Sequence, residues 1–258
     1  MAPTDRIKLS ACVITLNEAD RIDACLASLA FCDEIVVVDS GSTDDTRARA
    51  QAVGARVIER AFTGYRTQKD FAVQSAQHDW VLCLDADERV TPQLQAAITA
   101  ARDGGFAGAA GCRFARATEY FGRFLRHGNA YPDRVLRLFD RRRGGWRGER
   151  EIHEHVSIDG ATVTLAGDLE HRAYRSYSDQ LRRLQRYAQG MAEHMHGSGR
   201  RAHIGNLMLN PCWRFVRGYL LRAGFLDGWR GLVYAWTEAA YVRQKFVMLW
   251  LLDHDQRP

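Results

Sequence analysis

The chain has 258 residues, of which 46% are hydrophobic and 26% charged, values close to those of an average soluble globular protein. This composition excludes disordered, collagen-like and mucin-like chains, and the length suits one large domain or a domain with an extension. The formal net charge is +5, from 36 basic and 31 acidic residues. Lysine occurs only at Lys8, Lys69 and Lys245, so the basic excess is almost entirely arginine.

No stretch of the sequence reaches the roughly 18 consecutive apolar residues that a membrane-spanning helix needs. The first residues lack the apolar core and cleavage pattern of a signal peptide, so we expect none. The six cysteines show neither a C-x-x-C pair nor zinc-binding spacing. Cys12 and Cys83 lie in apolar runs, which favours buried, reduced thiols in a cytosolic protein.

The first hundred residues alternate between short apolar, β-branched runs and segments with helical periodicity. Asn17 and Asp20 form a helix-start pattern related to the capping box, and Thr91 followed by Pro92 begins a later helix. Repeated strand and helix units predict a mostly parallel sheet with helices on both faces. The predicted strands are 9–16, 34–39, 56–59 and 80–84, with a helix after each, including one over 65–76.

The pattern changes near Gly111. Shorter strand signals over 134–139, 156–158 and 162–165 predict a small, less regular antiparallel region. From Ser176 the pattern is helical, with a break expected at Pro211, and the tail is crowded with aromatic residues. We therefore divide the chain into segments 1–112, 113–175 and 176–258.

Polar residues follow three of the predicted strands at their carboxyl ends: Asn17 and Glu18, then Asp39, then Asp85 and Asp87. Ligands of parallel sheets bind beyond these strand ends, so we expect the side chains to meet at one edge. Two carboxylates separated by one small residue after a buried strand suit Mg²⁺ or Mn²⁺, which can bridge a diphosphate. Such acid pairs are also common in solvated turns, but the buried strand and the second acidic position at Asp39 favour the metal site.

The turn that starts at Asp39 is the second chemical signal. An aspartate that ends a strand can accept hydrogen bonds from a base or a ribose, and the turn 40–44 opens a helix whose N-terminus favours anions. Helix capping by Ser42 or Thr43 is an alternative that is compatible with this function. The chain lacks G-x-G-x-x-G, the P-loop pattern and G-x-S-x-G, which disfavours dinucleotide oxidoreductases, P-loop NTPases and serine hydrolases.

Three motifs carry a family resemblance: T-L-N-E at 15–18, V-V-V-D-S-G-S-T-D-D-T at 36–46 and L-D-A-D-E at 84–88. They resemble family 2 glycosyltransferases of the GT-A fold. The sequence is most similar to the lipopolysaccharide core branch, which includes enzymes that add β-glucose to a core heptose. The similarity covers most of the chain and continues through Gln68-Lys69, Tyr131–Asp133, Arg137–Phe139, Ile152–Glu154 and Gly224–Gly228.

The resemblance implies a GT-A-type, Rossmann-like α/β fold with a mostly parallel central sheet, a small antiparallel acceptor-side region and a C-terminal helical extension. Segment 1–112 would bind the nucleotide sugar, 113–175 would complete the acceptor side, and 176–258 would be the extension. It further implies inverting transfer of a hexose, expected to be glucose from UDP-glucose, with Mg²⁺ or Mn²⁺ as cofactor. The implied nucleotide-sugar-binding residues are Asn17, Glu18, Asp39, Ser40, Lys69 and Asp85, and the implied metal residues are Asp85 and Asp87, with Asp87 the more direct ligand.

An inverting transfer needs a carboxylate that removes the proton of the acceptor hydroxyl. We expect this base in the second half of the chain, with Glu154 first, Asp133 as the alternative, and Glu151 and Glu119 behind them. The chain lacks the T-E-D or Glu-Asp pair of larger family members. His153 is a candidate third metal ligand, although an ordinary polar role is more common for a histidine at such a position, and the same holds for His155 and His171.

The arginine excess lies outside the segment that carries the carboxylates. Segment 113–150 holds eleven arginines and four acids, and segment 172–222 holds ten arginines and two acids. Arg134 and Arg137 suit a donor diphosphate or a phosphorylated acceptor, or else a solvated basic face. The triplet Arg141–Arg143 is expected to be an exposed turn that meets a polyanion.

Aromatic residues beside arginines in the tail are typical either of core packing or of a helix at a membrane interface. We expect the protein to be cytoplasmic and peripheral on the cytoplasmic face of the inner membrane, with an anionic membrane surface as partner. Its acceptor would be a lipid-anchored oligosaccharide in lipopolysaccharide core assembly. Alternatives are a glycosyltransferase for another envelope polysaccharide or a polyprenyl-phosphate acceptor, and a non-catalytic membrane- or polyanion-binding protein. No nucleic-acid-binding motif accompanies the arginines.

Overall fold

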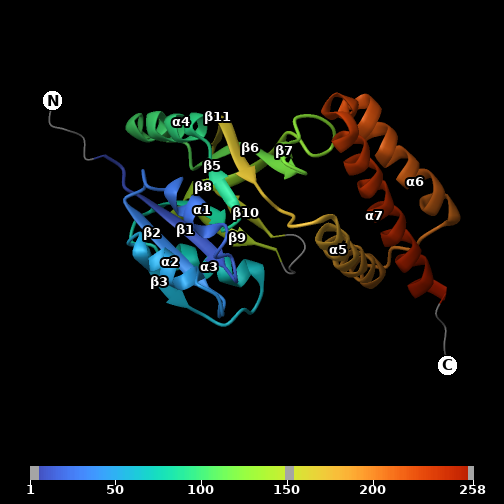
Figure 1. The fold of residues 1–258 in the computed structure, drawn as a ribbon, viewed down its shortest axis with the longest axis horizontal. Helices are drawn as coiled ribbons and strands as arrows, with labels where there is room; N and C mark the ends of the chain where they lie inside the picture. Colours follow the sequence, from blue (N-terminus) through green and yellow to red (C-terminus); the bar gives the residue numbers. More distant parts are fainter. Residues whose placement is uncertain (1–5, 149–153, 255–258) are drawn as a thin grey trace. The chain divides into compact units, whose positions relative to one another are not determined.

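The computed structural model describes residues 6–148 and 154–254 (Figure 1). The chain forms two compact units. The first comprises the residues up to Arg116 together with Arg134–His171, and the second comprises Ala117–Asp133 together with the residues from Arg172 onward. The second unit therefore combines the predicted helical extension with residues that the sequence places in the acceptor-side segment.

The first unit is built on a sheet with the strand order β3-β2-β1-β4-β8-β6-β11-β5. Its parallel part has β1 in the middle, paired with β2 and β4, while β3 pairs with β2. The predicted strands are confirmed almost to the residue: β1 is Leu9–Thr15, β2 Glu34–Asp39, β3 Arg56–Glu59 and β4 Trp80–Asp85. Continuous burial along β1 explains why its sequence is an unbroken apolar run.

The predicted antiparallel region continues the same sheet. β8 runs antiparallel to β4, and β11 pairs antiparallel with the short strand β5. A separate two-stranded ribbon is formed by β9 and β10. The bounds are Glu88–Val90 for β5, Gly111–Tyr120 for β6, Asp133–Asp140 for β8, Gly144–Arg147 for β9, His155–Ile158 for β10 and Thr162–His171 for β11.

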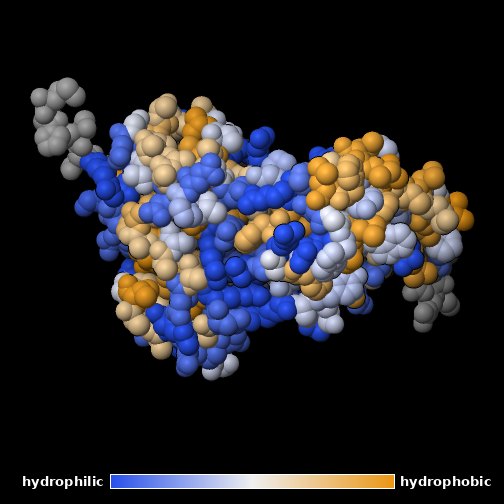
Figure 2. Space-filling view, turned by 45° about the horizontal axis from the view of Figure 1, so that its top comes forward, coloured by the Kyte–Doolittle hydropathy of each residue, from blue (hydrophilic) through white to orange (hydrophobic). Residues whose placement is uncertain are grey.

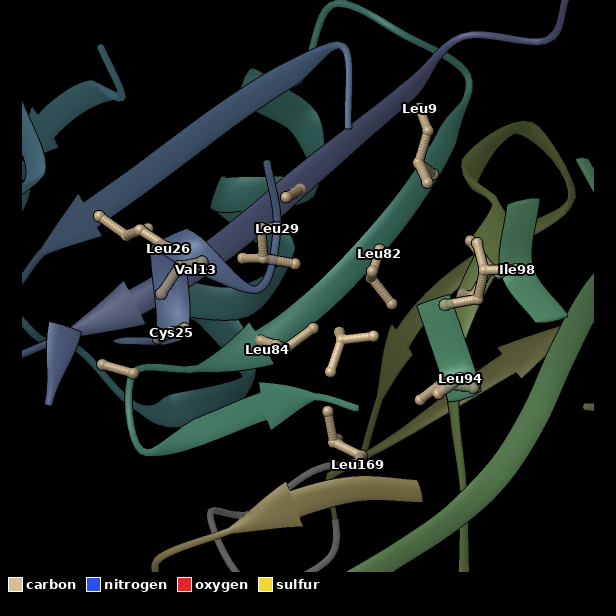
Figure 3. Close-up of a cluster of buried hydrophobic side chains, with 14 of the residues drawn as sticks. Leu9, Val13, Cys25, Leu26, Leu29, Leu82, Leu84, Leu94, Ile98 and Leu169 are labelled. Carbon is tan, nitrogen blue, oxygen red and sulfur yellow. The ribbon is translucent and has the colours of Figure 1, made fainter. Parts of the chain in front are cut away.

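Side chains that alternate along β1 divide the core of the first unit in two. Leu9 and Val13 pack in one cluster with α1, α2 and α4, as Figure 3 shows for Leu26, Leu94 and their neighbours. Cys12 and Ile14 face the other way and pack against α3 and the β9–β10 ribbon. Both faces of the sheet are therefore covered, as predicted. The helices are α1 Ile22–Ala27, α2 Thr46–Ala52, α3 Tyr65–Ser75 and α4 Pro92–Asp103, with short 3-10 turns at Gly105–Gly108 and Arg141–Arg143.

The two predicted helix starts differ in outcome. Thr91 accepts a hydrogen bond from the backbone N–H of Leu94, and Pro92 is the first residue of α4, so that prediction is confirmed. The capping pattern at Asn17 is wrong, because α1 begins only at Ile22. Asn17 instead adopts a left-handed φ of 53°, and its side-chain oxygen accepts a hydrogen bond from the N–H of Thr43. The residue thus ties two loops together.

The second unit is mainly helical. The turn after β6 forms a short hairpin with β7, Arg123–Phe124. Three helices follow, α5 Tyr177–Gly197, α6 Ile204–Val216 and α7 Gly228–His254, with the short turns η3 Arg217–Leu221 and η4 Gly224–Asp227 between the last two. α5 and α6 both pack along α7. Within the residues described, none of these helices is long and apolar enough to cross a membrane.

Pro211 lies inside α6, so the predicted break at this residue is wrong. An internal proline costs a helix about 3 kcal/mol, because it removes one backbone hydrogen bond and crowds the preceding turn. Packing of α6 along α7 offsets this cost. The helical region is instead interrupted on either side, between Gly197 and Ile204 and at η3.

Arg102 is an unusual core residue, because its guanidinium is almost completely buried at the end of α4. It donates hydrogen bonds to the carbonyls of Ile7 and Phe31 at 2.6 and 3.2 Å and to Asp33 at 2.6 Å. A buried charge is tolerated only when it is paired and hydrogen-bonded in this way. The contacts join the end of α4 to the segments that directly precede β1 and β2.

We predict that Arg102→Met lowers the free energy of unfolding by about 2–4 kcal/mol, because it removes the buried donor to the carbonyls of Ile7 and Phe31 and the short ion pair with Asp33. Urea unfolding of the purified protein measures the effect. The control is Arg49→Met: the pair Arg49–Asp23 has the same 2.6 Å separation, but both side chains are about half exposed. That change should cost less than about 1 kcal/mol, and similar losses for the two variants would contradict the prediction.

Candidate functional site

The register of the parallel strands brings the predicted acidic residues to one edge of the sheet. Thr15 at the end of β1 is aligned with Asp39 on β2, and Ile14 is aligned with Asp85 on β4. Asp39 and Asp85 therefore flank the carboxyl end of β1, where Asn17 and Glu18 follow. We call this cluster the acidic edge, defined by Glu18, Asp39, Asp85, Asp87 and Glu88.

Asp39 organises the loop beyond β2. Its carboxylate is fully buried and accepts hydrogen bonds from the N–H groups of Gly41 and Ser42, at 3.0 and 2.8 Å, and from the hydroxyl of Ser42. The Ser42 hydroxyl in turn accepts a hydrogen bond from the N–H of Asn17. Ser40, also predicted to bind the nucleotide sugar, accepts a hydrogen bond from the amide of Gln68. The predicted binding residues at the carboxyl ends of β1 and β2 thus belong to one hydrogen-bonded loop system.

Asp85 is held as an anion by two cations. Lys69 Nζ lies 3.1 Å from one carboxylate oxygen, and the guanidinium of Arg137 lies 3.4 Å from the other. Burial alone would raise the pKa of Asp85, but Lys69 and Arg137 outweigh it and hold the pKa well below its usual range. Lys69 and Arg137 also stack over the ring of Trp146, which helps to keep both cations in place.

Asp87 has the opposite environment, although it is only two residues away. Burial and the nearby carboxylates of Asp85 and Glu88 raise its pKa to about 7. Its closest cationic group, on Arg21, is 3.8 Å away. Among residues 6–148 and 154–254, no group donates a hydrogen bond to the buried oxygen Oδ1 of Asp87. The negative charge of Asp87 and of the carboxylates near it is therefore not balanced by the nearby guanidinium group.

His171 lies on the other side of Asp87, with Nε2 3.7 Å from a carboxylate oxygen. Burial and the nearby Arg116 lower the pKa of His171 to about 4, so the ring is neutral at physiological pH. A neutral imidazole beside carboxylates is a donor set that Mn²⁺ accepts, and carboxylates alone suit Mg²⁺. His153, the histidine named from the sequence as a candidate third ligand, lies outside the described residues.

A divalent cation fits the residues at Asp87 but would need further ligands. In the described part of the chain, no three or more His, Cys, Asp or Glu side chains converge as a self-sufficient metal site. The unpartnered oxygen of Asp87 and its raised pKa nevertheless show a local deficit of positive charge. The arrangement suits a cation that arrives with its own oxygen ligands, such as a metal–diphosphate.

Glu88 is a residue whose importance the sequence analysis missed. It is fully buried at the start of β5, and one carboxylate oxygen accepts a hydrogen bond from the N–H of Asp85 at 3.0 Å. The other oxygen lies 3.2 Å from Arg116 and 3.6 Å from Arg137. Glu88 therefore fixes the turn that carries both aspartates. Its place in L-D-A-D-E was visible in the sequence, but nothing there showed that it points into the protein.

Glu154, the residue predicted to be the base, is connected to the acidic edge by Lys69. Lys69 Nζ lies 2.6 Å from one oxygen of Glu154 and also contacts Asp85. Within the described ranges, the other, buried oxygen of Glu154 has no hydrogen-bond partner. The lysine thus places two carboxylates from distant parts of the chain on either side of one ammonium group.

The other sequence-predicted residues have different surroundings. Arg134 is exposed on β8, whereas Arg137 is buried beneath Asp85. Asp133 and Glu119 belong to the second unit, where Glu119 pairs with Arg172 at 2.9 Å. Glu151 lies outside the described residues. Asp133 as the alternative base remains a prediction.

Comparison with known sequences gives one matching family. The profile of Glycosyl transferase family 2 matches residues 10–160. A lipopolysaccharide core biosynthesis glycosyltransferase, LpsC, of Rhizobium meliloti (strain 1021) is 30% identical over 259 residues, which cover 94% of each chain. An uncharacterized glycosyltransferase, RP128, of Rickettsia prowazekii (strain Madrid E) is 27% identical over 250 residues, 88% of this chain and 81% of that one.

Two solved structures show the same type of fold. A mannosyltransferase of Pyrobaculum calidifontis, solved with GDP-Man and Mn²⁺, superposes with a TM-score of 0.58 at 19% identity over 96% of this chain and 88% of its own. Glucosyl-3-phosphoglycerate synthase of Mycobacterium tuberculosis, solved with Mn²⁺, UDP and glucosyl-3-phosphoglycerate, has a TM-score of 0.50 at 21% identity over 77% and 82% of the two chains. The predicted GT-A-type α/β fold is therefore confirmed.

Because the pKa values of Asp85 and Asp87 are shifted in opposite directions, we expect opposite effects of the two residues on the stability of the metal-free protein. The pKa of Asp87 in the folded state, about 7, lies above its ordinary value of 3.8, so ionisation of Asp87 destabilises the fold progressively between about pH 4 and pH 7. We expect Asp87→Asn to be more stable than the wild type by about 1–3 kcal/mol at pH 8, with the difference disappearing near pH 4.

The matched control is Asp85→Asn, because the folded-state pKa of Asp85 is lowered rather than raised. Its anionic form stabilises the fold above the ordinary pKa, and this stabilisation is lost as the pH falls. Asp85→Asn should therefore be less stable than the wild type at pH 8. Urea unfolding in EDTA measures both variants, and a change of the same sign in the two would refute the proposed charge distribution.

Proposed function

We propose that this chain, which belongs to glycosyl transferase family 2 and is a glycosyltransferase, transfers a hexose from a nucleotide sugar to a saccharide of the lipopolysaccharide core. Glucose from UDP-glucose is the expected donor group. The name of the Rhizobium relative supports the acceptor class. Complexes of the two similar structures, one with GDP-Man and one with UDP, support a nucleotide-sugar donor.

The observation that carries this proposal is the uncompensated negative charge of Asp87 beside Asp85. Asp87, with Asp85 and His171 next to it, would hold Mg²⁺ or Mn²⁺, and the bound cation would neutralise charge on the departing nucleoside diphosphate. Both similar structures contain Mn²⁺, which supports a divalent cation without distinguishing the two metals. Arg137 contributes indirectly, because it lies beneath Asp85 and keeps that carboxylate charged.

The loop system around Asp39 would bind the nucleoside. Asn17, Glu18 and Ser40 lie beside this loop, and Asp39 holds the loop in place by accepting hydrogen bonds from two backbone N–H groups and from the Ser42 hydroxyl. Asp39 would therefore act on base and ribose mainly by keeping this loop in the binding conformation. Lys69, at the centre of the ion-pair cluster, would lie near the nucleotide phosphates, while the exposed Arg134 suits a phosphate group on donor or acceptor.

Inverting transfer would take place in one displacement. The acceptor hydroxyl oxygen attacks the anomeric carbon, the bond from that carbon to the diphosphate oxygen breaks, and the hydroxyl proton passes to the base. Glu154 is the proposed base, because one buried oxygen of its carboxylate has no hydrogen-bond partner among residues 6–148 and 154–254, while the other oxygen is anchored by Lys69. The anchor holds the proposed base close to the residues that would bind the leaving group.

The proposed location follows from the acceptor. A lipid-anchored oligosaccharide would be reached by a protein that is peripheral on the cytoplasmic face of the inner membrane, attached to an anionic surface by the arginine-rich residues 172–222. Transfer to another envelope polysaccharide or a polyprenyl-phosphate acceptor uses the same donor site and is the second candidate. A non-catalytic polyanion-binding role is disfavoured, because Asp39, Asp85 and Asp87 are all present at the acidic edge.

Donor binding tests the proposal directly. A ligand that binds only the folded state raises its stability, so the matching nucleotide sugar with Mn²⁺ or Mg²⁺ should raise the melting temperature by several degrees. The screen compares UDP-glucose, other UDP-sugars and GDP-mannose, each with and without metal. Asp87→Asn should lose the metal-dependent part of the shift, and an equal shift in this variant would remove Asp87 from the metal site.

The base assignment is tested by Glu154→Gln beside Asp133→Asn. We expect Glu154→Gln to lower the rate of transfer by about 10²–10⁴-fold, because a glutamine cannot accept the hydroxyl proton. The metal-dependent thermal shift with donor should persist in this variant, which separates lost chemistry from lost binding. A large rate loss in Asp133→Asn with near-normal turnover in Glu154→Gln would transfer the role of base to Asp133.

A further inference from the structure

The second unit exposes an unusual amount of apolar surface in one part of its sequence. Eleven large apolar side chains between residues 204 and 236 are 41–74% exposed. Figure 2 shows hydrophobic side chains gathered over this part of the molecule. We call this surface the apolar patch; its members are Ile204, Met208, Leu209, Trp213, Leu220, Leu221, Phe225, Leu226, Trp229, Leu232 and Trp236.

Helix α6 reverses the ordinary arrangement of an amphipathic helix. Ile204 and Met208 are four positions apart, as are Leu209 and Trp213, so each pair lies on neighbouring turns, and together these exposed side chains cover about half of the circumference of the helix. A helix on the surface of a soluble protein normally presents its polar side to water. The exposed side of α6 is thus suited to an environment less polar than water.

The patch continues through the turns that follow α6. Leu220 and Leu221 lie in η3, Phe225 and Leu226 in η4, and Trp229 in the first turn of α7. η3 contacts α6 and η4, and η4 contacts α7, so these elements are neighbours. Contiguous apolar surface of this kind on a single chain marks a site of interaction with a protein or a membrane.

The charges around the patch identify the partner. Segment 200–236 contains six arginines and a single acid, Asp227. Asp227 does not offset them at the surface, because its carboxylate accepts hydrogen bonds from the N–H groups of Arg126 and His127 and its side chain is only 10% exposed. A second copy of the chain would bring the same arginines into contact with each other. An anionic surface that also offers apolar depth matches both properties.

We propose that the apolar patch inserts into the acyl-chain boundary of an anionic lipid bilayer, with the arginines of segment 200–236 at the headgroups. Tryptophan beside arginine is the composition of helices that lie in this interface. Arg230 lies at this boundary. Its guanidinium stacks on Trp229 and donates a hydrogen bond to the carbonyl of Phe121. The half-exposed ring of Phe121 also contacts Trp229 and extends the apolar surface.

This inference refines the proposed membrane location, and rests on the proposed function only for the identity of the lipid-linked acceptor. The proposal of arginine-based attachment predicts a purely electrostatic association that salt abolishes. Insertion of the patch predicts a second component, because buried apolar surface contributes binding free energy that salt does not screen. The two modes are therefore separable in one experiment.

The test is flotation of the full chain with vesicles of phosphatidylcholine alone or mixed with phosphatidylglycerol. We expect binding to the anionic vesicles that largely persists at about 0.5 M NaCl, where the Debye length is only a few ångström. Brominated acyl chains in the same vesicles should quench tryptophan fluorescence, because three of the six tryptophans belong to the patch. Salt-sensitive binding without quenching, or no binding, would overturn the proposal.

The matched variants carry the same number of exposed apolar changes. Trp213→Ser with Leu221→Ser should weaken partition into the vesicles more than about tenfold. Val53→Ser with Phe62→Ser changes two exposed residues of the first unit and should leave partition unchanged. Unchanged partition in the first pair, or sedimentation showing a dimer that only this pair disrupts, would assign the patch another role or another copy of the chain.

The variant Asp87→Asn distinguishes the test of membrane insertion from the test of donor binding. This change affects the acidic edge in the first unit and leaves the apolar patch intact, so the variant should float with the vesicles as well as the wild type. Normal flotation with no donor binding in the wild type would leave the membrane inference standing and refute the proposed donor site. The reverse result would refute the inference and keep the donor site.

Discussion

The acidic edge depends on the hydrogen bond and the ion pairs of the buried Glu88 carboxylate. This carboxylate accepts a hydrogen bond from the N–H of Asp85 and forms ion pairs with the guanidinium groups of Arg116 and Arg137. A buried anion without such partners would be strongly destabilising, so the turn at Asp85–Asp87 is fixed by the need to satisfy Glu88. That one constraint places Asp85 against two cations and leaves Asp87 short of them.

The difference between the two aspartates gives the site its chemical direction. Both carboxylates are close to the end of β4, yet one is kept ionised by its neighbours and the other is opposed by them. A cation that binds beside an unbalanced carboxylate gains favourable electrostatic free energy. A site whose charges are already paired would offer less of it. The raised pKa of Asp87 has the opposite consequence for folding, because its charged form is favoured less in the folded protein than in the unfolded chain.

Much of the fold could be predicted because it depends on local patterns. A fully buried strand and the start of a helix each leave a short signal in the sequence. These signals correctly predict β1, β4 and the cap at Thr91. The local patterns at Asn17 and Pro211 predict the wrong structure for one reason: contacts with distant residues outweigh the local preference. Asn17 bonds to the loop after β2, and packing along α7 keeps α6 helical through Pro211.

The candidate site was only partly visible in the sequence, because its ion pairs join residues far apart along the chain. Strand ends predicted that Asp39 and Asp85 would meet. No spacing rule relates Lys69 to Glu154, which are brought together by α3 and the segment before β10. The same limitation explains Glu88 and His171, whose burial depends on how β5 pairs with β11. Tertiary contacts decide which of many acids and histidines belong to the site.

The arginine count misleads when it is taken as a measure of attraction for a polyanion. Arg116 and Arg137 neutralise Glu88 inside the protein, and Arg141 donates hydrogen bonds to the carbonyls of Val73 and Ala76 at the end of α3. These arginines of segment 113–150 stabilise the fold, and the expectation that the turn at Arg141–Arg143 meets a polyanion remains a prediction. In segment 200–236 the arginines instead accompany exposed tryptophan and leucine. Charge and apolar exposure together, rather than charge alone, identify the surface that faces a partner.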